Sequence, residues 1–326
     1  MALLFFLPEI AAFLIFFMMA TQSVPFSPLL AAAEVALLAL LIVFRAQVAL
    51  QTALKWWPLL LMPILAPIST LWSDAPMTTL RYGAQFLATA YLGVLLARLM
   101  TPRRFLIVFM VSLFVFCLAC ILYGRQGVSA EGMVLVGLTG SKNQMGYAAQ
   151  LLVLSGLAVL LLRETASWLR WIAALSLPLG IGVLVGVNSA TALLMGVGGA
   201  VVLLALWFAE RLQPSGRLVG LIVTIIIITP LLLLAPEISA AWDNFLFNTL
   251  NKDPTLTGRT VLWEYADEFI ARRPFLGYGY QAFWMGESAD TLALKRMFFV
   301  TDGRTFHFHH QYRQVAMDTG LIGLVA

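Results

Sequence analysis

The sequence predicts an all-α polytopic membrane protein, and three observations support that prediction. Of its 326 residues, 61% are hydrophobic and only 11% are charged, whereas about a quarter of the residues in an ordinary soluble domain are charged. Apolar runs long enough to cross a hydrocarbon core of ~30 Å as helices recur along the chain. These runs lack the two-residue alternation of barrel strands, so helices are the spanning structure that remains.

About ten membrane helices are predicted, each built on ~20 mainly apolar residues. The first apolar run has no basic segment before it and no convincing small-residue cleavage site, so we interpret it as a membrane helix rather than a signal peptide. The last run stops at Ala326 while still apolar, which predicts the truncated start of a further helix. The predicted helices cover residues 3–20, 29–44, 57–72, 81–98, 105–123, 144–162, 171–187, 190–208 and 218–235, and the last begins near residue 313.

Basic residues in the short loops predict the orientation, because Lys and Arg are retained on the cytoplasmic side. Loops after even-numbered helices carry nine basic residues, and loops after odd-numbered helices carry three. This asymmetry predicts a cytoplasmic N-terminus, and we expect the membrane to be the inner membrane of a bacterium. The nine are Arg45, Lys55, Arg98, Arg103, Arg104, Arg163, Arg170, Arg211 and Arg217, and the three are Arg81, Arg125 and Lys142.

One long periplasmic loop, residues 236–312, is predicted between nine transmembrane helices in residues 1–235 and a further helix that starts in residues 313–326. The loop holds all three histidines and, with Asp318 just beyond it, ten of the sixteen acidic residues. Loops of this length are usually functional or disordered. Its many aromatic residues argue against disorder, so we expect a functional segment.

A short amphipathic helix is predicted inside this loop. Leu262, Ala266 and Phe269 recur at helical spacing, Thr260 is available as an N-cap, and Pro274 ends the run. We expect this helix to lie on the membrane or over a cavity.

Composition and absent motifs narrow the functional classes. The net charge of +4 comes from basic residues scattered through short loops, so nucleic acid is not an expected partner. The sequence has no P-loop, no His-Glu-x-x-His, no Gly-x-Ser-x-Gly and no Cys/His cluster at zinc spacing, and neither a metal nor another cofactor is predicted. Cys117 and Cys120 are three helical positions apart, which favours buried packing residues over a disulfide.

Three basic residues at the outer ends of predicted helices are candidates for binding an anion. Arg81 is predicted to open the fourth helix, Lys142 the sixth, and Arg259 follows a glycine inside the long loop. A cation near a helix N-terminus adds to the positive end of the helix dipole, which suits a diphosphate. The alternative is an interfacial side chain that snorkels. Asn143 and Arg304 are secondary candidates.

His307, His309 and His310 lie where the long loop re-enters the membrane. A histidine with a pKa of ~6.5 can act as a general base near neutral pH and take the proton of an attacking hydroxyl. The competing interpretation is a structural patch, or one that binds metal adventitiously. Their position beside the candidate cations favours catalysis, and no metal site is predicted.

Several motifs resemble the O-antigen ligase and polymerase superfamily, most closely its exopolysaccharide polymerases. The resemblance covers most of the chain, from about residue 60 to the end, and the order of the motifs agrees with placement on the outer face. The family's last motif usually reads His-Asn before a helix that ends in Gly-Leu-Ile-Gly, which aligns His309 with the family's His, His310 with its Asn and Asp318 with a usual Glu. The motifs are residues 69–74 ahead of Arg81, residues 141–143, residues 257–259 with Trp263, residues 273–279 and residues 309–323.

The resemblance implies an inverting glycosyltransferase that uses a lipid-linked donor. Such proteins take a glycan from an undecaprenyl diphosphate carrier and pass it to an acceptor hydroxyl, without a nucleotide sugar or an obligatory metal. It implies Arg81, Lys142 and Arg259 on the diphosphate and His309 or His310 as the base, a choice that the departure from His-Asn leaves open. The implied partners are the undecaprenyl-diphosphate-linked glycan donor, the glycan acceptor, membrane lipid and other polysaccharide assembly proteins.

Other functions remain open. A ligase would use a lipid A core acceptor, whereas a polymerase would use a second lipid-linked repeat, and the histidine-rich re-entry favours the polymerase. A transporter or flippase of lipid-linked glycan is the alternative from another class. Its basis is that Pro63 and Pro67 interrupt the third predicted helix, and that the seventh is loosened by Gly180, Gly182 and Gly186. Glu9 and Glu34, within predicted helices, would suit proton coupling. A non-catalytic scaffold would leave the basic and histidine residues at one face unexplained.

Overall fold

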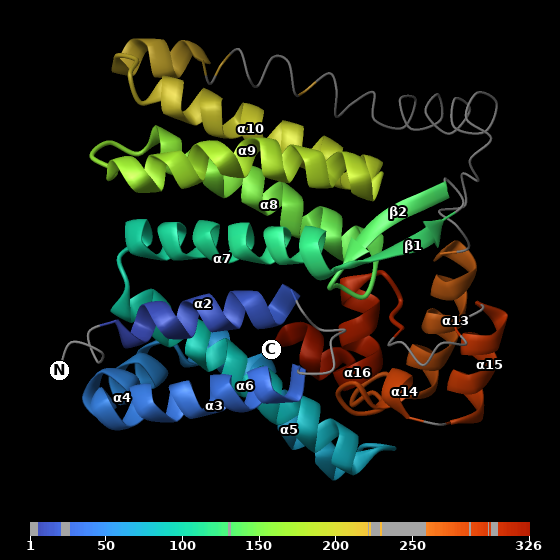
Figure 1. Ribbon diagram of the computed structural model, residues 1–326. Coiled ribbons are helices and arrows are strands. Elements are labelled where there is room, and N and C mark those ends of the chain that lie inside the picture. The colour runs from blue at the N-terminus through green and yellow to red at the C-terminus, as the bar shows by residue number, and fades with distance from the viewer. Residues whose placement is uncertain are drawn as a thin grey trace. The chain divides into compact units, whose positions relative to one another are not determined.

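The protein is predominantly helical, with one two-stranded hairpin, in the computed structural model (Figure 1). By its internal contacts the chain divides into two compact units, Met1–Leu60 with Gln85–Trp207, and Leu61–Ala84 with Phe208–Ala326. The structure describes residues 6–20, 27–129, 132–220, 222, 229, 259–286, 288–298, 300 and 306–326.

The first unit is built mainly of apolar helices. Among the described residues, α7, α8, α9 and α10 are long and apolar enough to cross a membrane, and α3 with α4 makes a fifth candidate that bends by 103°. These helices fit a multi-pass membrane protein, while the count of ten helices stays a prediction. Helix α6 (Pro76–Leu99) contributes its residues from Gln85 onward to this unit. The other elements are α2 (Leu7–Ala20), α3 (Ser27–Phe44), α4 (Ala46–Lys55), the 3-10 turn η1 (Trp57–Leu60), α7 (Pro102–Tyr123), β1 (Arg125–Ser129), β2 (Gly132–Gly137), α8 (Lys142–Leu161), α9 (Ser167–Val187) and α10 (Ala190–Ala209).

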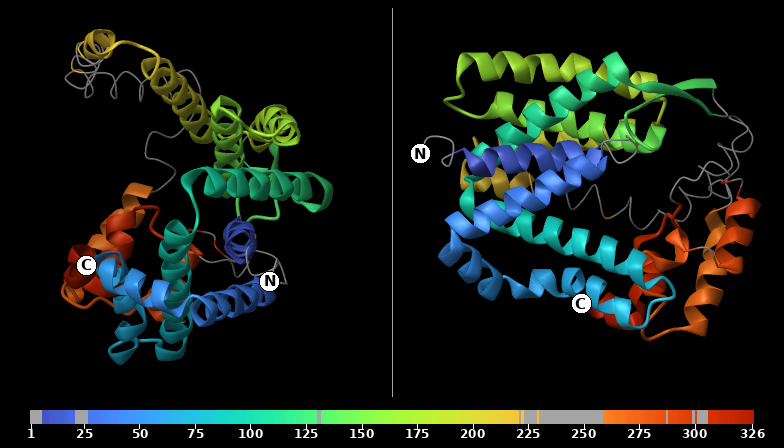
Figure 2. Two further views of the ribbon diagram at one scale, coloured as in Figure 1. Left: turned by 90° about the vertical axis from the view of Figure 1, so that its left-hand side faces the viewer. Right: turned by 60° about the horizontal axis from the view of Figure 1, so that its bottom comes forward.

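Two segments that were expected as loops have regular structure. Residues 46–55 form α4, and the segment after α7 forms the antiparallel hairpin β1–β2, which projects from the end of α7 in Figures 1 and 2. The third predicted helix is instead three short pieces, η1, α5 (Leu61–Ile68) and the 3-10 turn η2 (Ser69–Leu71), with Pro67 inside α5. Most of the ninth predicted helix, residues 218–235, lies outside the described residues.

Small residues let α8 and α9 pack closely. A Cβ added to Gly156 would lie 2.8 Å from the Ser176 Cβ, and one added to Gly180 would lie 2.6 Å from Val153 Cγ2. Membrane helices rely on such close backbone approach because lipid gives them no hydrophobic drive to associate. Gly180 therefore packs α9 onto α8 rather than loosening it, which corrects the expectation for this residue.

Cys117 and Cys120 belong to the same buried core. Both are free and fully buried among residues of α7, α8 and α9, which confirms the predicted packing role. The Cys120 sulfur also accepts a hydrogen bond of 3.3 Å from the backbone N–H of Leu138, just after β2, so it ties the hairpin to α7.

The second unit surrounds an aromatic core. The amphipathic helix predicted around residues 260–270 is α13, which begins one residue before the expected cap Thr260 and ends ahead of Pro274 as expected. Its buried face packs on Phe283, Trp284 and Phe308. The elements are α5, η2, the start of α6, α13 (Arg259–Arg272), α14 (Ala282–Met285), α15 (Ala289–Met297) and α16 (Gln311–Val325).

The last helix, α16, begins at Gln311, close to the predicted start at residue 313. It is not one continuous helix, because Gly320 has φ 65° and ψ −161° and breaks it. Residues 274–279 form backbone hydrogen bonds with α16 on both sides of this kink.

Candidate functional site

Three motifs that lie far apart in the sequence meet in the second unit. We call this meeting point the motif junction and define it as residues 69–79, 273–280 and 317–322. The loop 273–280 is hydrogen-bonded to the break in α16, with Tyr278 N–H donating to Met317 O at 2.9 Å and Leu321 N–H donating to Pro274 O at 2.8 Å. The loop thereby satisfies backbone groups that the broken helix leaves unpaired.

The segment from η2 to the start of α6 completes the motif junction from the other side. The backbone N–H of Tyr280 donates to Ser69 Oγ at 2.9 Å, and Thr79 Oγ1 donates to Tyr280 O at 3.0 Å. Trp72 Nε1 donates to Leu276 O at 2.8 Å. Most of these side chains form hydrogen bonds with backbone groups of the loop. These motifs therefore hold the loop in place as a scaffold.

Glycine is required where the loop meets α16. Gly277 has φ +65°, and a Cβ there would lie 2.5 Å from Met317 O. Gly320 has φ +65° as well, and its Cβ would lie 2.2 Å from Phe275 O. Left-handed backbone and contact distances below 3 Å both exclude larger residues.

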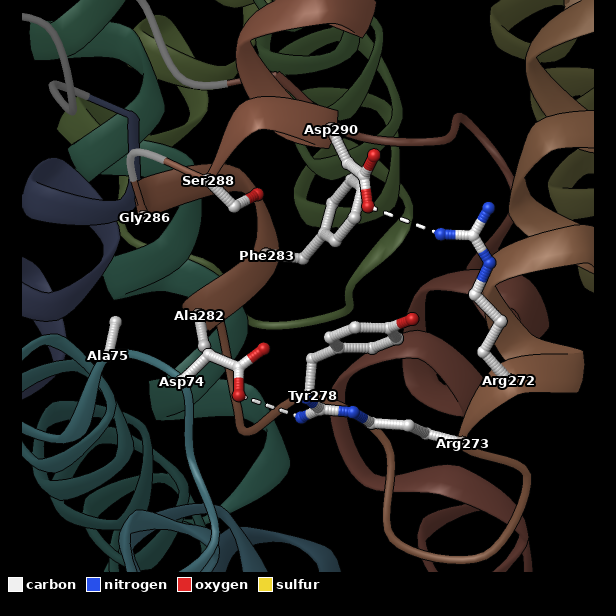
Figure 3. Close-up of a pocket in the computed structure, with 10 residues that line it drawn as sticks. All are labelled: Asp74, Ala75, Arg272, Arg273, Tyr278, Ala282, Phe283, Gly286, Ser288 and Asp290. Atoms are coloured by element: carbon white, nitrogen blue, oxygen red, sulfur yellow. Dashed lines mark hydrogen bonds and ion pairs between the residues drawn. The ribbon is translucent and has the colours of Figure 1, made fainter.

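A cavity of about 490 Å³ opens beside the motif junction. Figure 3 shows two ion pairs in its wall, Arg273 Nη1 to Asp74 Oδ1 at 2.7 Å and Arg272 Nη1 to Asp290 Oδ2 at 3.3 Å, with the ring of Tyr278 drawn between them. Because its two arginines are paired with carboxylates, much of their positive charge is compensated within the wall. None of the residues that line this cavity was predicted from the sequence as a site residue.

The histidines lie at the start of α16. His310 is the N-cap residue, and its Nδ1 accepts the backbone N–H of Arg313 at 3.3 Å. His309, just before it, is exposed and has φ +53°. Its backbone N–H donates to Nδ1 of His307 at 3.1 Å, and their ring centroids lie 4.1 Å apart. The two candidate bases thus have different surroundings, since one ring nitrogen of His310 is occupied by the cap.

Side chains of α13 and α16 hold the histidine segment in place. Trp263 Nε1 donates to Phe308 O at 2.8 Å, and the Arg313 guanidinium lies over the Trp263 ring at 5.2 Å. Arg313 also donates to both carboxylate oxygens of Asp267 at 2.7 and 2.8 Å. These hydrogen bonds are the main reason that the pKa of Asp267 is lowered from its ordinary value. We call Trp263, Asp267 and Arg313 the clamp.

The candidate cations are only partly described. Arg81 is exposed with its guanidinium 5.5 Å from the Tyr82 ring, but α6 begins at Pro76, so Arg81 lies in the second turn and does not open the helix as expected. Lys142 does open α8, after an N-cap at Ser141. Asn143 follows it and is exposed.

The structure describes less of the other two candidate cations, Arg259 and Arg304. Arg259 begins α13, but its side chain lies outside the described residues, as does all of Arg304. Lys142 belongs to the first unit, whereas Arg81, Arg259 and His309 belong to the second. Their convergence on one diphosphate therefore stays a prediction. Among the described residues, no group of three His, Cys, Asp or Glu side chains is arranged to hold a metal ion.

Sequence reasoning missed the clamp. The available signal was the spacing of Trp263 and Asp267, which are four residues apart and so share a face of α13. Arg313 stands three residues after His310, in the first turn of α16. The pairing between the two helices depends on tertiary structure and could not be found from spacing alone.

The two carboxylates proposed for proton coupling lie in the first unit. Glu9 forms an ion pair with Arg104 at the start of α7. Glu34 is buried in α3, with a hydrogen bond to the side chain of Thr89. Glu9 thus has a structural partner, which weakens the case for a proton carrier there.

Comparisons with known proteins agree with the motifs. Residues 175–326 match the O-antigen ligase family. The chain is also 29% identical, over 265 residues, to the exopolysaccharide production protein ExoQ of Rhizobium meliloti strain 1021. That alignment covers 80% of this chain and 60% of the relative, so the chain spans about three fifths of the relative's length.

No solved structure matches the chain significantly. The family match includes α13, the clamp, the histidine segment and α16, which are the parts of the second unit described above. Together, the two sequence comparisons confirm the resemblance drawn from the motifs: over residues 175–326 this membrane protein is similar to the O-antigen ligase family.

Proposed function

We propose that this protein transfers or polymerises oligosaccharide repeat units from undecaprenyl diphosphate on the periplasmic face of the bacterial inner membrane. The observation that carries the proposal is His309, an exposed imidazole next to the start of α16, inside the region that matches the O-antigen ligase family. The clamp fixes the backbone just before it, since Trp263 holds Phe308 O. A base held in position in this way suits the activation of a sugar hydroxyl.

The chemistry needs one base and a means of stabilising the leaving group. His309 takes the proton of the acceptor hydroxyl as its oxygen attacks the anomeric carbon of the donor sugar. The bond to the diphosphate oxygen breaks, and negative charge grows on the departing diphosphate. Lys142, Arg81 and Arg259 stabilise that charge, with Asn143 and Arg304 in secondary roles. Direct displacement inverts the anomeric centre.

The proposed topology follows the distribution of charge. Residues 1–235 would form nine membrane helices with the N-terminus in the cytoplasm, residues 236–312 the periplasmic loop, and residues 313–326 the start of a further helix. The donor is a glycan on undecaprenyl diphosphate and the acceptor is another glycan, with membrane lipid and other polysaccharide assembly proteins as further partners.

We favour a polymerase over a ligase. The relative ExoQ is named for exopolysaccharide production, and the histidine-rich segment before α16 favours the same assignment. The acceptor is then the end of a second lipid-linked repeat rather than a lipid A core.

The proposal is tested by gel analysis of polymer in a deletion strain that carries the full-length wild type or a variant. His309→Ala should abolish long glycan at normal membrane level. Tyr312→Phe, at a neighbouring exposed side chain, is the matched control and should retain it. Normal polymer from the His309→Ala variant would refute a catalytic His309, and transport assays in proteoliposomes would then test the flippase alternative.

A further inference from the structure

We propose that His310 is a positioning residue, not the base: it caps α16 through Nδ1 and so fixes the backbone that presents His309. The inference rests on the proposed role of His309. It resolves a choice between two adjacent histidines that the sequence left open.

The cap determines where the ring proton of His310 lies. Nδ1 accepts the backbone N–H of Arg313 at 3.3 Å, and His310 has the extended backbone of an N-cap residue, with φ −147° and ψ 108°. An imidazole nitrogen that accepts a hydrogen bond carries no proton, so the proton of the neutral ring is on Nε2. Nε2 then has no lone pair to offer, and the lone pair of Nδ1 is occupied by the cap, so His310 is not placed to act as the base in this conformation.

The ring of His310 is also held from the side. It meets the Trp263 ring edge to face, with centroids 5.3 Å apart and planes at 82°. Trp263 is itself fixed by its hydrogen bond to Phe308 O and by the Arg313 guanidinium over its face. His310 is thus one member of a packed group that joins α13 to α16.

These contacts fix the chain on both sides of His309. Phe308 is buried, its carbonyl accepts from Trp263, and its N–H donates to Gln314 Oε1 at 3.4 Å. On the other side, His310 is fixed by the cap. His309 between them has φ +53°, a conformation that is uncommon for a non-glycine residue. The contacts of Phe308 and His310 therefore fix the backbone position from which the exposed His309 ring extends.

The test uses the chemistry that an N-cap needs. Asn is among the best N-cap residues and Ala among the poorest, but neither is a base near neutral pH. In the full-length protein we expect His310→Ala to lower polymer at least fivefold at equal membrane level and to lower the Tm. His310→Asn should recover most of both losses. His309→Asn should give no polymer.

A cap in the first unit provides the matched control. Thr101 caps α7 with the same acceptor distance, 3.3 Å to the N–H of Arg104. Thr101→Ala should lower the Tm to a similar degree as His310→Ala but retain polymer, which separates general loss of stability from loss of positioning.

The outcomes separate this inference from the proposed function. If His310→Asn is as inactive as His310→Ala at equal membrane level, the imidazole itself is needed and the inference is wrong. Unchanged Tm and polymer in His310→Ala would also overturn it. If polymer is normal in the His309 variants while the Tm falls in His310→Ala and recovers in His310→Asn, the cap is supported and the proposed function fails.

Discussion

Asp267 and Arg313 join α13 to the first turn of α16 through two parallel hydrogen bonds, Nε to Oδ1 at 2.7 Å and Nη2 to Oδ2 at 2.8 Å. The two residues are 46 positions apart in the chain and flank the histidine segment. Because this bidentate pair orients Arg313 over Trp263, its geometry bears on the position of His309 as well as on stability.

Asp267→Asn should reduce polymer several-fold while costing at most about 1 kcal/mol of unfolding free energy, since the Asp267 side chain is 56% exposed and exposed ion pairs contribute little. Glu268→Gln is the matched control, because Glu268 is equally exposed but pairs with Arg272 within α13. Polymer analysis and thermal unfolding in detergent measure the two effects. Equal polymer from the two variants would argue against a positioning role for the clamp.

The stability that Asp267 contributes should depend on pH in one direction. Arg313 holds the pKa of Asp267 below its ordinary value of 3.8. A carboxyl whose pKa is lower in the folded state stabilises the protein above its unfolded pKa, and this stability is lost as pH falls through the folded pKa. The Tm difference between wild type and Asp267→Asn should therefore be constant near neutral pH and shrink below about pH 4. A difference that grows on acidification would contradict the assignment.

Trp263→Phe should lower polymer several-fold without loss of membrane protein. The ring that packs on His310 is largely retained, but the Nε1 donor to Phe308 O is lost, which leaves a buried carbonyl short of a partner at a cost of about 1–3 kcal/mol. Trp168→Phe, at an exposed tryptophan of α9, is the control and should keep full polymer. If Trp263→Phe matches this control, the Phe308 contact does not position the segment.

Gly277→Ala should prevent accumulation of folded protein. Its Cβ would meet Met317 O at 2.5 Å in a left-handed backbone, so the motif junction would have to open, at a cost of several kcal/mol (about 3 or more). Gly93→Ala in α6 is the control, because no heavy atom lies within 4 Å of the added Cβ. Blotting of membrane fractions and detergent unfolding curves should show loss for the first variant and normal levels for the second.

If Lys142 binds the diphosphate as proposed, Lys142→Gln should lower kcat/KM for a lipid diphosphate donor by about tenfold or more, because that charge-assisted contact would be lost. Lys142→Arg keeps the charge and should retain much of the activity. Lys55→Gln, which removes a cation in α4 beside Trp56, is the control for net charge. The same kcat/KM for Lys142→Gln and Lys55→Gln would remove Lys142 from the diphosphate site.

The amino-acid sequence by itself determined the class of the protein. Hydropathy is a local property, and a run of apolar residues in lipid must satisfy its backbone within the run, so helices such as α7 to α10 were predicted nearly to their ends. The motifs that carry the family resemblance were also recognised in the sequence alone, and the comparisons confirmed that resemblance. The helix α13 was found because its apolar spacing and the following Pro274 are both local signals.

Only the tertiary structure decided what the motif residues do. Ser69 and Tyr280 are 211 positions apart and Asp74 and Arg273 are 199 apart, yet each pair is in contact, and no local pattern encodes such pairings. The roles of His309 and His310 were likewise decided by the tertiary structure, because two adjacent residues of the same type cannot be told apart from the sequence. His310 has a backbone N–H on its Nδ1 and His309 an exposed ring, because the fold of α16 and its clamp give adjacent residues different environments.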